Sequence, residues 1–364
     1  MNVKFLNLQK QQKKIKKRLM SEISSIIDKG AFVAGEKVKQ FEENFSNYCG
    51  SKYCVATSSG TTALHVALSC YDVAGEVITA PNSFIATSEA VSYCPNLKHK
   101  FVDVDSTSNI VFQKTLSSVT KKTKILLPVS LYGNPCDLFS LKTLSKTQNL
   151  ILIHDAAQAH GALCGDKNIS DYADLTCYSF YPGKNLGTSG EGGAVTTNSR
   201  RLYELMKCLI NHGQSRKYHH ALVGFNYRMS EIEAATLDIK LDYIEEWTEK
   251  RIRAAHRYKT NLAENKKIKF LRVKEGDRCV YHLFPIFIKN RNKIQEELKK
   301  EGIETALHYP KPIHLQRAYK NLKYQKGDFP VAEMQAASEL SLPIYPEITQ
   351  REIDYVCKKL NKIL

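Results

Sequence analysis

The chain has 364 residues, 43% hydrophobic and 25% charged, a balance typical of a globular protein with one large and one smaller domain. No apolar run is long enough to cross a bilayer, and the lysine-rich N-terminus lacks the apolar segment of a signal peptide. The ten cysteines include no C-x-x-C pair and no complete set of zinc ligands, so we expect free thiols, a cytoplasmic protein and no metal centre.

The net charge of +16 comes from 53 basic and 37 acidic residues, with lysines spread along the whole chain. Charge of this kind argues for solubility and association with anions, but it defines no site. Because no zinc finger, RNP-like motif or recognition helix accompanies it, we expect neither a nucleic-acid nor a membrane partner. A polyanion-binding protein is the alternative from a different functional class.

Helical and strand patterns alternate through the first two thirds of the chain. The expected helices cover residues 6–28, 36–48, 61–68 and 86–93. The expected strands cover residues 53–57, 76–80, 101–105, 124–129 and 150–154. Several of these strands are continuously apolar, which suits strands covered on both faces. The alternation predicts a parallel sheet whose ligands lie beyond the carboxyl ends of the strands.

After about residue 230 the pattern changes. Residues 229–258 form one long, highly charged helical pattern that would bridge to a second domain. A strand over 281–288 and helices over 292–301 and 350–364 would complete a small α+β unit. We therefore expect a large domain over 1–235, and the bridging helix with a small domain over 236–364.

Two segments at predicted strand ends suggest a site. Residues 57–64 run from a strand through small residues into a helix, and free N–H groups at such a helix start bind anions, although an ordinary N-cap using Ser58 or Ser59 explains the pattern too. In residues 154–161, Asp155 stands at the end of an apolar strand. A carboxylate in such a place either has a cationic partner that keeps it charged or only caps the helix that follows.

A third segment, Tyr178–Ala194, places Lys184 among five glycines. It is not a phosphate-binding Walker loop, because Tyr178 and Asn185 stand where that motif needs a glycine and a hydroxyl residue. A lysine amine that forms a Schiff base is one interpretation, and a solvated loop lysine is the other. Together, an anion site, a carboxylate and an amine are what pyridoxal phosphate (PLP) needs for its phosphate, ring nitrogen and aldehyde.

The chain resembles the DegT/DnrJ/StrS family of PLP-dependent sugar aminotransferases, and the likeness extends over nearly its whole length. The matching segments are Phe32–Glu36, Ser59–Leu64, Ala80–Thr87, Val102–Asp105, Asp155–Gly161, Tyr178–Ala194, Gly224–Met229 and 308–310. The resemblance implies the α/β fold of aspartate aminotransferase (PLP fold type I). That fold has a large domain with a mostly parallel seven-stranded sheet and a small C-terminal α+β domain.

The resemblance also implies roles for matching residues. Lys184 would be the catalytic lysine that joins the cofactor and moves the proton, and Asp155 would pair with the pyridine nitrogen. The other cofactor contacts would be Gly60, Thr61, Phe84, Gln158, Ser179 and, from the neighbouring subunit of a homodimer, Asn226. A branch of the family with histidine in place of the lysine performs dehydration, so Lys184 favours transamination.

The segments around Lys184, Asn211–Tyr218 and His308–His314 are most similar to the subgroup that acts on dTDP-3-oxo-6-deoxyhexoses. L-Glutamate would be the amino donor, and the product a dTDP-3-amino-3,6-dideoxyhexose for a surface glycan or lipopolysaccharide. A 4-oxo sugar nucleotide linked to UDP, dTDP or GDP is the alternative substrate. The candidate substrate-binding residues are His160, Tyr181, Lys217, Tyr218, Arg228, His308 and Tyr309.

Overall fold

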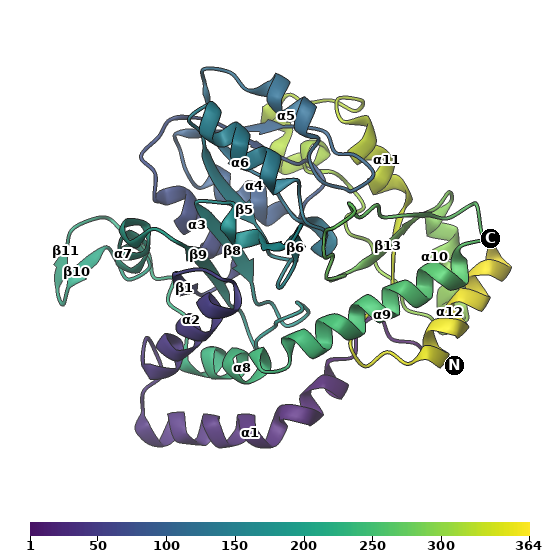
Figure 1. Cartoon of the computed structure of the whole chain (residues 1–364), viewed down its shortest axis with the longest axis horizontal. Helices are drawn as coiled ribbons and strands as arrows, with labels where there is room; N and C mark the ends of the chain where they lie inside the picture. The colour runs from purple at the N-terminus through teal and green to yellow at the C-terminus, as the bar shows by residue number, and fades with distance from the viewer.

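A seven-stranded sheet forms the centre of the computed structural model, which describes all 364 residues (Figure 1). The strand order is β1–β9–β8–β5–β4–β2–β3. The strands are β1 (Tyr53–Thr57), β2 (Gly75–Thr79), β3 (Leu97–Phe101), β4 (Thr123–Leu127), β5 (Ile151–Asp155), β8 (Leu175–Ser179) and β9 (Gly193–Thr197). All neighbouring pairs are parallel except those of β9, which runs antiparallel to β1 and β8. The mostly parallel seven-stranded sheet of the aminotransferase fold is therefore confirmed.

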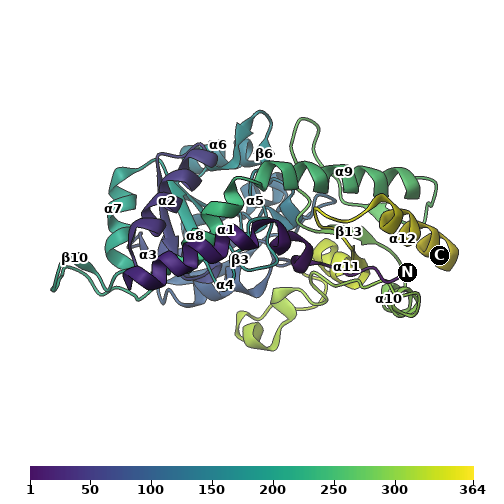
Figure 2. The ribbon, with the colours of Figure 1, turned by 90° about the horizontal axis from the view of Figure 1, so that it is seen from below.

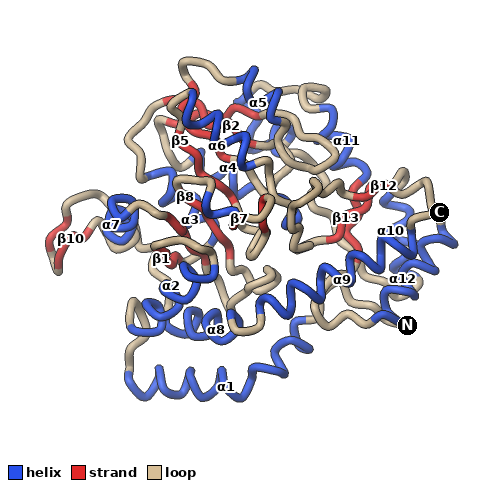
Figure 3. The backbone as a smooth tube through the Cα atoms, in the orientation of Figure 1, coloured by secondary structure: helices blue, strands red, loops and turns tan.

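Helices cover both faces of this sheet (Figure 3). They are α2 (Glu36–Tyr48), α3 (Gly60–Ser69), α4 (Ile85–Ser92), α5 (Phe112–Ser118), α6 (Leu138–Thr147), α7 (Arg200–Leu209) and α8 (Glu231–Leu241). Successive strand residues enter different cores: Leu126 packs with α2, α6 and α8, whereas Ile125 and Leu127 pack with α3, α4 and α7. Because side chains alternate across a strand, a strand buried on both faces must be continuously apolar, as the sequence pattern indicated.

The strand predicted over residues 101–105 is wrong. The paired strand is β3, which aligns with β2 from Gly75 opposite Leu97 to Thr79 opposite Phe101. The N–H of Val102 still donates to Thr79 of β2 at 3.0 Å, and beyond it the chain leaves the sheet and forms an isolated bridge between Val104 and Ile110. The strand was shifted in the prediction because β3 lies at the sheet edge and carries polar side chains there.

The single helix predicted over residues 229–258 is two helices, α8 and α9 (Ile244–Leu262), separated at Asp242 and Tyr243. Neither glycine nor proline marks the break, so the apolar period continues across it. Helix α9 then runs from the large unit to the smaller one, as predicted for a bridging helix (Figure 1). Helix α1 (Leu8–Lys29) packs against α8, where Ile15 and Leu19 contact Ile239.

The small unit contains an antiparallel sheet of β12 (Lys269–Phe270), β13 (Phe284–Phe287) and β14 (Glu339–Leu342), with α10 (Arg291–Lys300) and α12 (Gln350–Ile363). The strand predicted over 281–288 is thus shorter at its start. Tyr281 has a φ of 43°, a left-handed conformation that no strand residue adopts. The remaining short elements are β6 (Leu163–Cys164), β7 (Lys167–Asn168), β10 (Gln214–Arg216), β11 (His219–His220) and α11 (Pro330–Ser338), with the 3-10 helices η1 (Leu131–Gly133), η2 (Ile169–Asp171), η3 (Ile313–Leu315) and η4 (Arg317–Leu322).

The chain passes between the two units more than once. Val3 pairs with Ile303 and is buried in the core of the small unit, which places the N-terminus beside α10 and α12 (Figure 2). Residues Ile313 and Phe329 return to the core of the large unit. The domain boundary between 235 and 236 stays a prediction, but packing crosses it in both directions. No helix is both long and apolar enough to span a membrane.

Candidate active site

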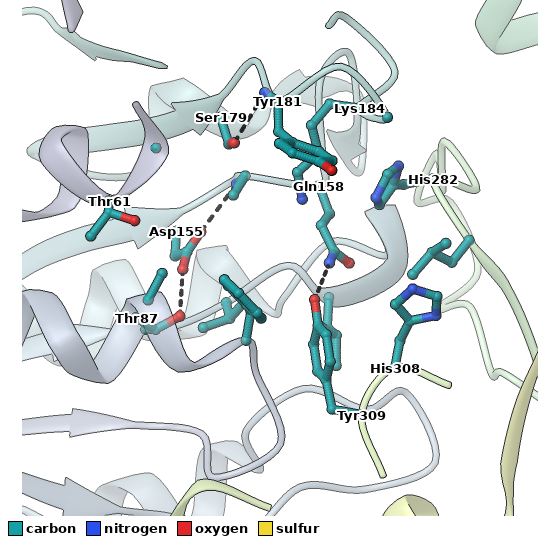
Figure 4. A pocket seen from close by; sticks show the side chains of 18 of the residues that line it. Thr61, Thr87, Asp155, Gln158, Ser179, Tyr181, Lys184, His282, His308 and Tyr309 are labelled. Carbon is teal, nitrogen blue, oxygen red and sulfur yellow. Dashed lines mark hydrogen bonds between the residues drawn. The ribbon is translucent and has the colours of Figure 1, made fainter. Parts of the chain in front are cut away.

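A cavity of about 580 Å³ opens beyond the carboxyl ends of β5 and β8, between the large unit and the small one. Its volume is in the range of small-molecule sites, and parallel sheets place their ligands at this edge. Figure 4 shows the side chains that line it. The large unit supplies residues from α3, α4, β5 and the segment after β8, while the small unit supplies His282, His308 and Tyr309.

The start of α3 forms one end of the cavity. Ser59 caps this helix by accepting the N–H of Thr62, and the Thr62 hydroxyl accepts the N–H of Ser59 in return. The cap leaves the N–H groups of Gly60 and Thr61 without a helical partner, and such groups bind anions together with the helix dipole. A Cβ on Gly60 would lie 2.5 Å from the Cβ of Ser179, so only glycine fits beside that hydroxyl residue. This end therefore fits a phosphate group.

Asp155 ends β5 and is buried at the cavity wall (Figure 4). One carboxylate oxygen accepts the Thr87 hydroxyl at 2.7 Å, and the other accepts the N–H of Ala157 at 3.1 Å. Burial raises the pKa of the Asp155 carboxyl, whereas these two bonds and the charge of Lys184 oppose the rise. A buried carboxylate of this kind fits a protonated ring nitrogen.

Lys184 lies in the turn after β8, and its Nζ has no hydrogen-bond or ion-pair partner within the chain. Burial lowers the pKa of its amine to about 8, although the charge of Asp155 favours the protonated form. The turn is held by Lys240, whose buried ammonium donates to the carbonyl of Gly187. An unpaired amine with a lowered pKa suits Schiff-base and proton-transfer chemistry, so a solvated loop lysine no longer describes it.

Gln158 presents its amide N–H₂ to the cavity. Its Oε1 accepts the N–H of Tyr132 at 2.6 Å, which fixes the amide orientation, and its Nε2 donates to the Tyr309 hydroxyl at 3.3 Å (Figure 4). The ring of Phe84 lies 5.4 Å from that of Tyr309. These side chains and Asp155 border a space that suits a flat ring carrying a hydrogen-bond acceptor.

The structure brings most of the predicted site residues to this one cavity. These are Gly60, Thr61, Phe84, Asp155, Gln158, Ser179, Tyr181, Lys184, His308 and Tyr309. His160 does not line it: its ring is fully buried against Tyr178 and Phe180, which makes a direct substrate contact unsuitable.

Four further predicted residues lie away from the cavity of their own chain: Asn226, Lys217, Tyr218 and Arg228. The hairpin of β10 and β11, with Lys217 and Tyr218 between its strands, projects from the body of the molecule (Figure 2). Arg228 donates to the side chain of Asn226 and is engaged there. A role for these residues therefore requires a second chain, as the prediction for Asn226 already implied.

Several lining residues were not anticipated. Thr87 ends the segment Ala80–Thr87, for which the resemblance implies no role at this position, and its bond to Asp155 gives it one. The sequence pattern places His282 in a strand and Arg251 on a highly charged helix, and neither pattern indicates a site. Arg251 is buried and donates to the carbonyls of Tyr281, His282 and Ile344, which no local sequence signal reveals.

A desolvated lysine and a buried carboxylate face one space, and a helix start suited to phosphate closes its end. Fold and site together define a pyridoxal-phosphate-dependent aminotransferase. The chain belongs to the DegT/DnrJ/EryC1/StrS aminotransferase family, whose model matches residues 13–361.

Known proteins resemble the chain over almost its full length. A "dTDP-3-amino-3,6-dideoxy-alpha-D-galactopyranose transaminase" of Aneurinibacillus thermoaerophilus is 35% identical, with 99% of each chain covered. A "pleiotropic regulatory protein" of Geobacillus stearothermophilus is also 35% identical, over 99% of this chain and 98% of its own. The crystal structure of S. venezuelae DesV in complex with a ketimine intermediate superposes with a TM-score of 0.97 at 33% identity, covering 100% of this chain and 98% of DesV. The chain is thus a member of a family of PLP-dependent enzymes that aminate nucleotide-linked sugars.

Proposed function

We propose that the enzyme transfers the amino group of L-glutamate to a dTDP-3-oxo-6-deoxyhexose and so makes a dTDP-3-amino-3,6-dideoxyhexose for a surface glycan or lipopolysaccharide. The observation that carries the proposal is the unpaired Lys184 amine at the cavity wall with Asp155, with Tyr181, His308 and Tyr309 lining the same space. The similarity to a transaminase of a dTDP-3-amino sugar supports the choice of the 3-position.

The predicted cofactor-binding residues of the cavity each have a role in this reaction. Bound pyridoxal phosphate supplies an electron-withdrawing ring and a carbonyl that receives and delivers the amino group. The N–H groups of Gly60 and Thr61, with the Ser179 hydroxyl, would hold the phosphate, while Gln158 would donate to the ring oxygen. Asp155 would keep the ring nitrogen protonated, which preserves its electron-withdrawing character.

Lys184 is the proposed proton carrier. With a pKa of about 8, its amine can be neutral near physiological pH and take the proton from the Cα of glutamate. The same group would pass that proton to the cofactor before 2-oxoglutarate leaves, and in the second half-reaction it would deliver a proton to the sugar carbon that receives the amino group. The two half-reactions share one cavity, so ping-pong kinetics are expected.

A homodimer would complete the substrate site. Tyr218 is 80% exposed and Val223 is 93% exposed, and both belong to the segment that projects from the chain. Apolar side chains in such a position favour burial against a partner. A second copy would bring Asn226 toward the phosphate, and Lys217 and Arg228 toward the diphosphate of the sugar nucleotide.

The test is amination of defined sugar nucleotides. The enzyme is incubated with glutamate and dTDP-linked 3-oxo or 4-oxo 6-deoxyhexoses, or with UDP-linked oxo sugars, and the product is identified by mass spectrometry and NMR. Amination of the dTDP-3-oxo sugar alone supports the proposal. Amination of only a 4-oxo or UDP-linked sugar refutes the substrate, and no bleaching of the cofactor's visible band by glutamate refutes the reaction.

A further inference from the structure

A buried carboxylate stands behind His308, outside the predicted set of site residues. Glu339 and Ser341 are alternate residues of β14 and so point to the same face of the strand. Ser341 pairs with Ala306 through two backbone hydrogen bonds of 2.9 and 3.2 Å, which brings this face against the segment that carries His308. Glu339 is only 1% exposed, and Ser341 is fully buried.

Three hydrogen bonds connect these residues. Glu339 accepts the backbone N–H of His308 at 2.7 Å on Oε2 and the Ser341 hydroxyl at 2.5 Å on Oε1. The Ser341 oxygen lies 2.9 Å from Nδ1 of His308. A serine hydroxyl has one hydrogen, and this one points to the Glu339 carboxylate as long as the carboxylate is ionised. The serine oxygen must therefore accept from Nδ1, so Nδ1 carries the ring hydrogen.

The other ring nitrogen of His308, Nε2, consequently has a free lone pair. No side chain or backbone group of the protein hydrogen-bonds to it, and His308 lines the cavity (Figure 4). Burial and the charge of Lys184 lower the pKa of His308 to about 4, so the imidazole is neutral in the working range of pH. Phe5 stacks on the ring at 5.8 Å and helps to fix its plane.

We propose that Glu339 and Ser341 are positioning residues that hold His308 as the Nδ1–H tautomer, so that Nε2 accepts a hydrogen bond from a hydroxyl group of the sugar. This inference rests on the proposed function for the identity of the ligand, but the tautomer follows from the protein alone. The Nδ1–H tautomer makes the cavity prefer a hydrogen-bond donor, such as a hydroxyl, next to Nε2. A group that can only accept would place its own lone pair against the lone pair of Nε2.

The protonation state of Glu339 determines which group donates and which accepts in the hydrogen bonds from Glu339 through Ser341 to His308. Burial raises the pKa of Glu339 to about 7. Once protonated, Glu339 can donate to Ser341, whose hydrogen then turns to Nδ1 and moves the ring hydrogen to Nε2. The acceptor form of His308 therefore belongs to pH values above about 7. The charged or titratable groups near the Glu339–His308 pair are Arg291, which donates to the Glu339 carbonyl at 2.7 Å, and Tyr132, Tyr309, Lys184 and His282.

Glu339→Gln tests the inference because a carboxamide must reverse the bonds. Its oxygen has to accept the His308 N–H, so its N–H₂ donates to Ser341, and the serine hydrogen then points to Nδ1. Nitrogen-15 NMR of histidine-labelled protein at pH 8, with His308→Gln for assignment, should show Nδ1–H in the wild type and Nε2–H in the variant. Since Nε2–H then donates instead of accepting, the sugar hydroxyl loses the acceptor for its own hydrogen, and we expect kcat/KM for the sugar to fall about tenfold or more, with the glutamate half-reaction unchanged.

Glu231→Gln is the matched control. The buried Glu231 carboxylate also accepts backbone N–H groups, those of Gly35 at 2.8 Å and Lys37 at 2.9 Å, but it neither lines the cavity nor bonds to a histidine. It should leave both the tautomer and kcat/KM unchanged. Ser341→Ala keeps the bond from His308 N–H to Glu339 and removes the relay, so it should give mixed tautomers and an intermediate kcat/KM.

The outcomes separate this inference from the proposed function. An Nε2–H signal for wild-type His308 at pH 8, or the same tautomer in wild type and Glu339→Gln, would overturn the relay whatever the enzyme aminates. If no sugar is aminated but the tautomers behave as expected, the proposed substrate fails and the relay stands. If Glu339→Gln does not retain the visible absorption band of the cofactor, Ser341→Ala becomes the test. The inference is then refuted if His308 has the same tautomer in Ser341→Ala as in the wild type.

Discussion

Replacing Thr87 with valine should raise the pKa of the Asp155 carboxyl, the proposed partner of the ring nitrogen, and leave Lys184 in place. The Thr87 hydroxyl is the hydrogen-bond donor to one oxygen of Asp155, at 2.7 Å, and Thr87 is buried. Valine keeps the branched shape but has no hydrogen to donate, and its additional methyl group lies against a carboxylate oxygen that then lacks a partner in the protein.

The size of the effect follows from the charge on the acceptor. A hydrogen bond to an ionised group contributes about 1.5–3 kcal/mol, and one pKa unit corresponds to about 1.4 kcal/mol. The loss should therefore raise the pKa of Asp155 by about one to two units. Because the pKa of Asp155 is already raised by burial, a further rise reduces the ionised fraction in the acidic part of the working range. As the pH is lowered, cofactor affinity and the rate of the glutamate half-reaction should therefore both begin to fall at a higher pH than in the wild type.

The assay is cofactor binding and the glutamate half-reaction, each followed by visible absorbance from about pH 5 to pH 9. Thr236→Val is the matched control, because the Thr236 hydroxyl is equally buried but donates to the carbonyl of Ile232 at 2.8 Å, a neutral acceptor. It should cost about 1 kcal/mol of stability and leave the acidic limb in place. If the two variants show the same pH profile, Thr87 does not support the charge of Asp155 and the reasoning is refuted.

Three further predictions follow from the cavity. Lys184→Ala should lower transamination by at least about 10²–10⁴-fold and prevent borohydride from fixing the cofactor to the protein. Gly60→Ala should weaken cofactor affinity by about 1–3 kcal/mol in a titration, because the new Cβ would lie 2.5 Å from Ser179. The pKa of Glu339 rises from 4.5 to about 7 on folding. Its contribution to the free energy of unfolding is therefore full below pH 4.5 and falls by about 3 kcal/mol as the pH rises to about 7. Glu339→Gln should remove this pH dependence of stability, measured by denaturant titrations at about pH 5 and pH 8.

The sequence predicts the most strongly apolar strands of the sheet well, but it does not predict β8 and β9, which are buried too. Strands β4 and β5 are apolar on both faces, so their patterns are strong and their positions were found within a residue or two. The prediction misplaced β3 because this edge strand carries the polar residues Lys98 and Lys100. Its pairing with β2 joins distant parts of the chain and leaves no local sequence signal. The break between α8 and α9 was missed for a similar reason, since the tertiary turn there needs no helix-breaking residue.

Residues at the ends of parallel strands could be predicted to meet, since topology gathers these ends at one edge. Asp155 is of this kind, whereas Ser179 ends β8, a strand that was not predicted, and its role was implied only by the family resemblance. His308 and Tyr309 were found only through the family resemblance, because their place depends on how the small unit packs against the large one. Glu339 could not be found at all: its importance lies in being buried behind His308, and a glutamate on a short strand carries no signal of burial.

The charges around the cavity also suit Lys184 to the proposed proton transfer. Burial and the charge of Lys184 lower the pKa values of His282 and His308, so both imidazoles stay neutral beside it. The Asp155 carboxyl is stabilised in its ionised form by two donors and by the same lysine charge. With its neighbours held in fixed states, a proton gained or lost near pH 8 is localised on Lys184, the amine proposed to move it. A lysine exposed to solvent would remain protonated at that pH, so desolvation of Lys184 by the surrounding chain is what makes its amine a base.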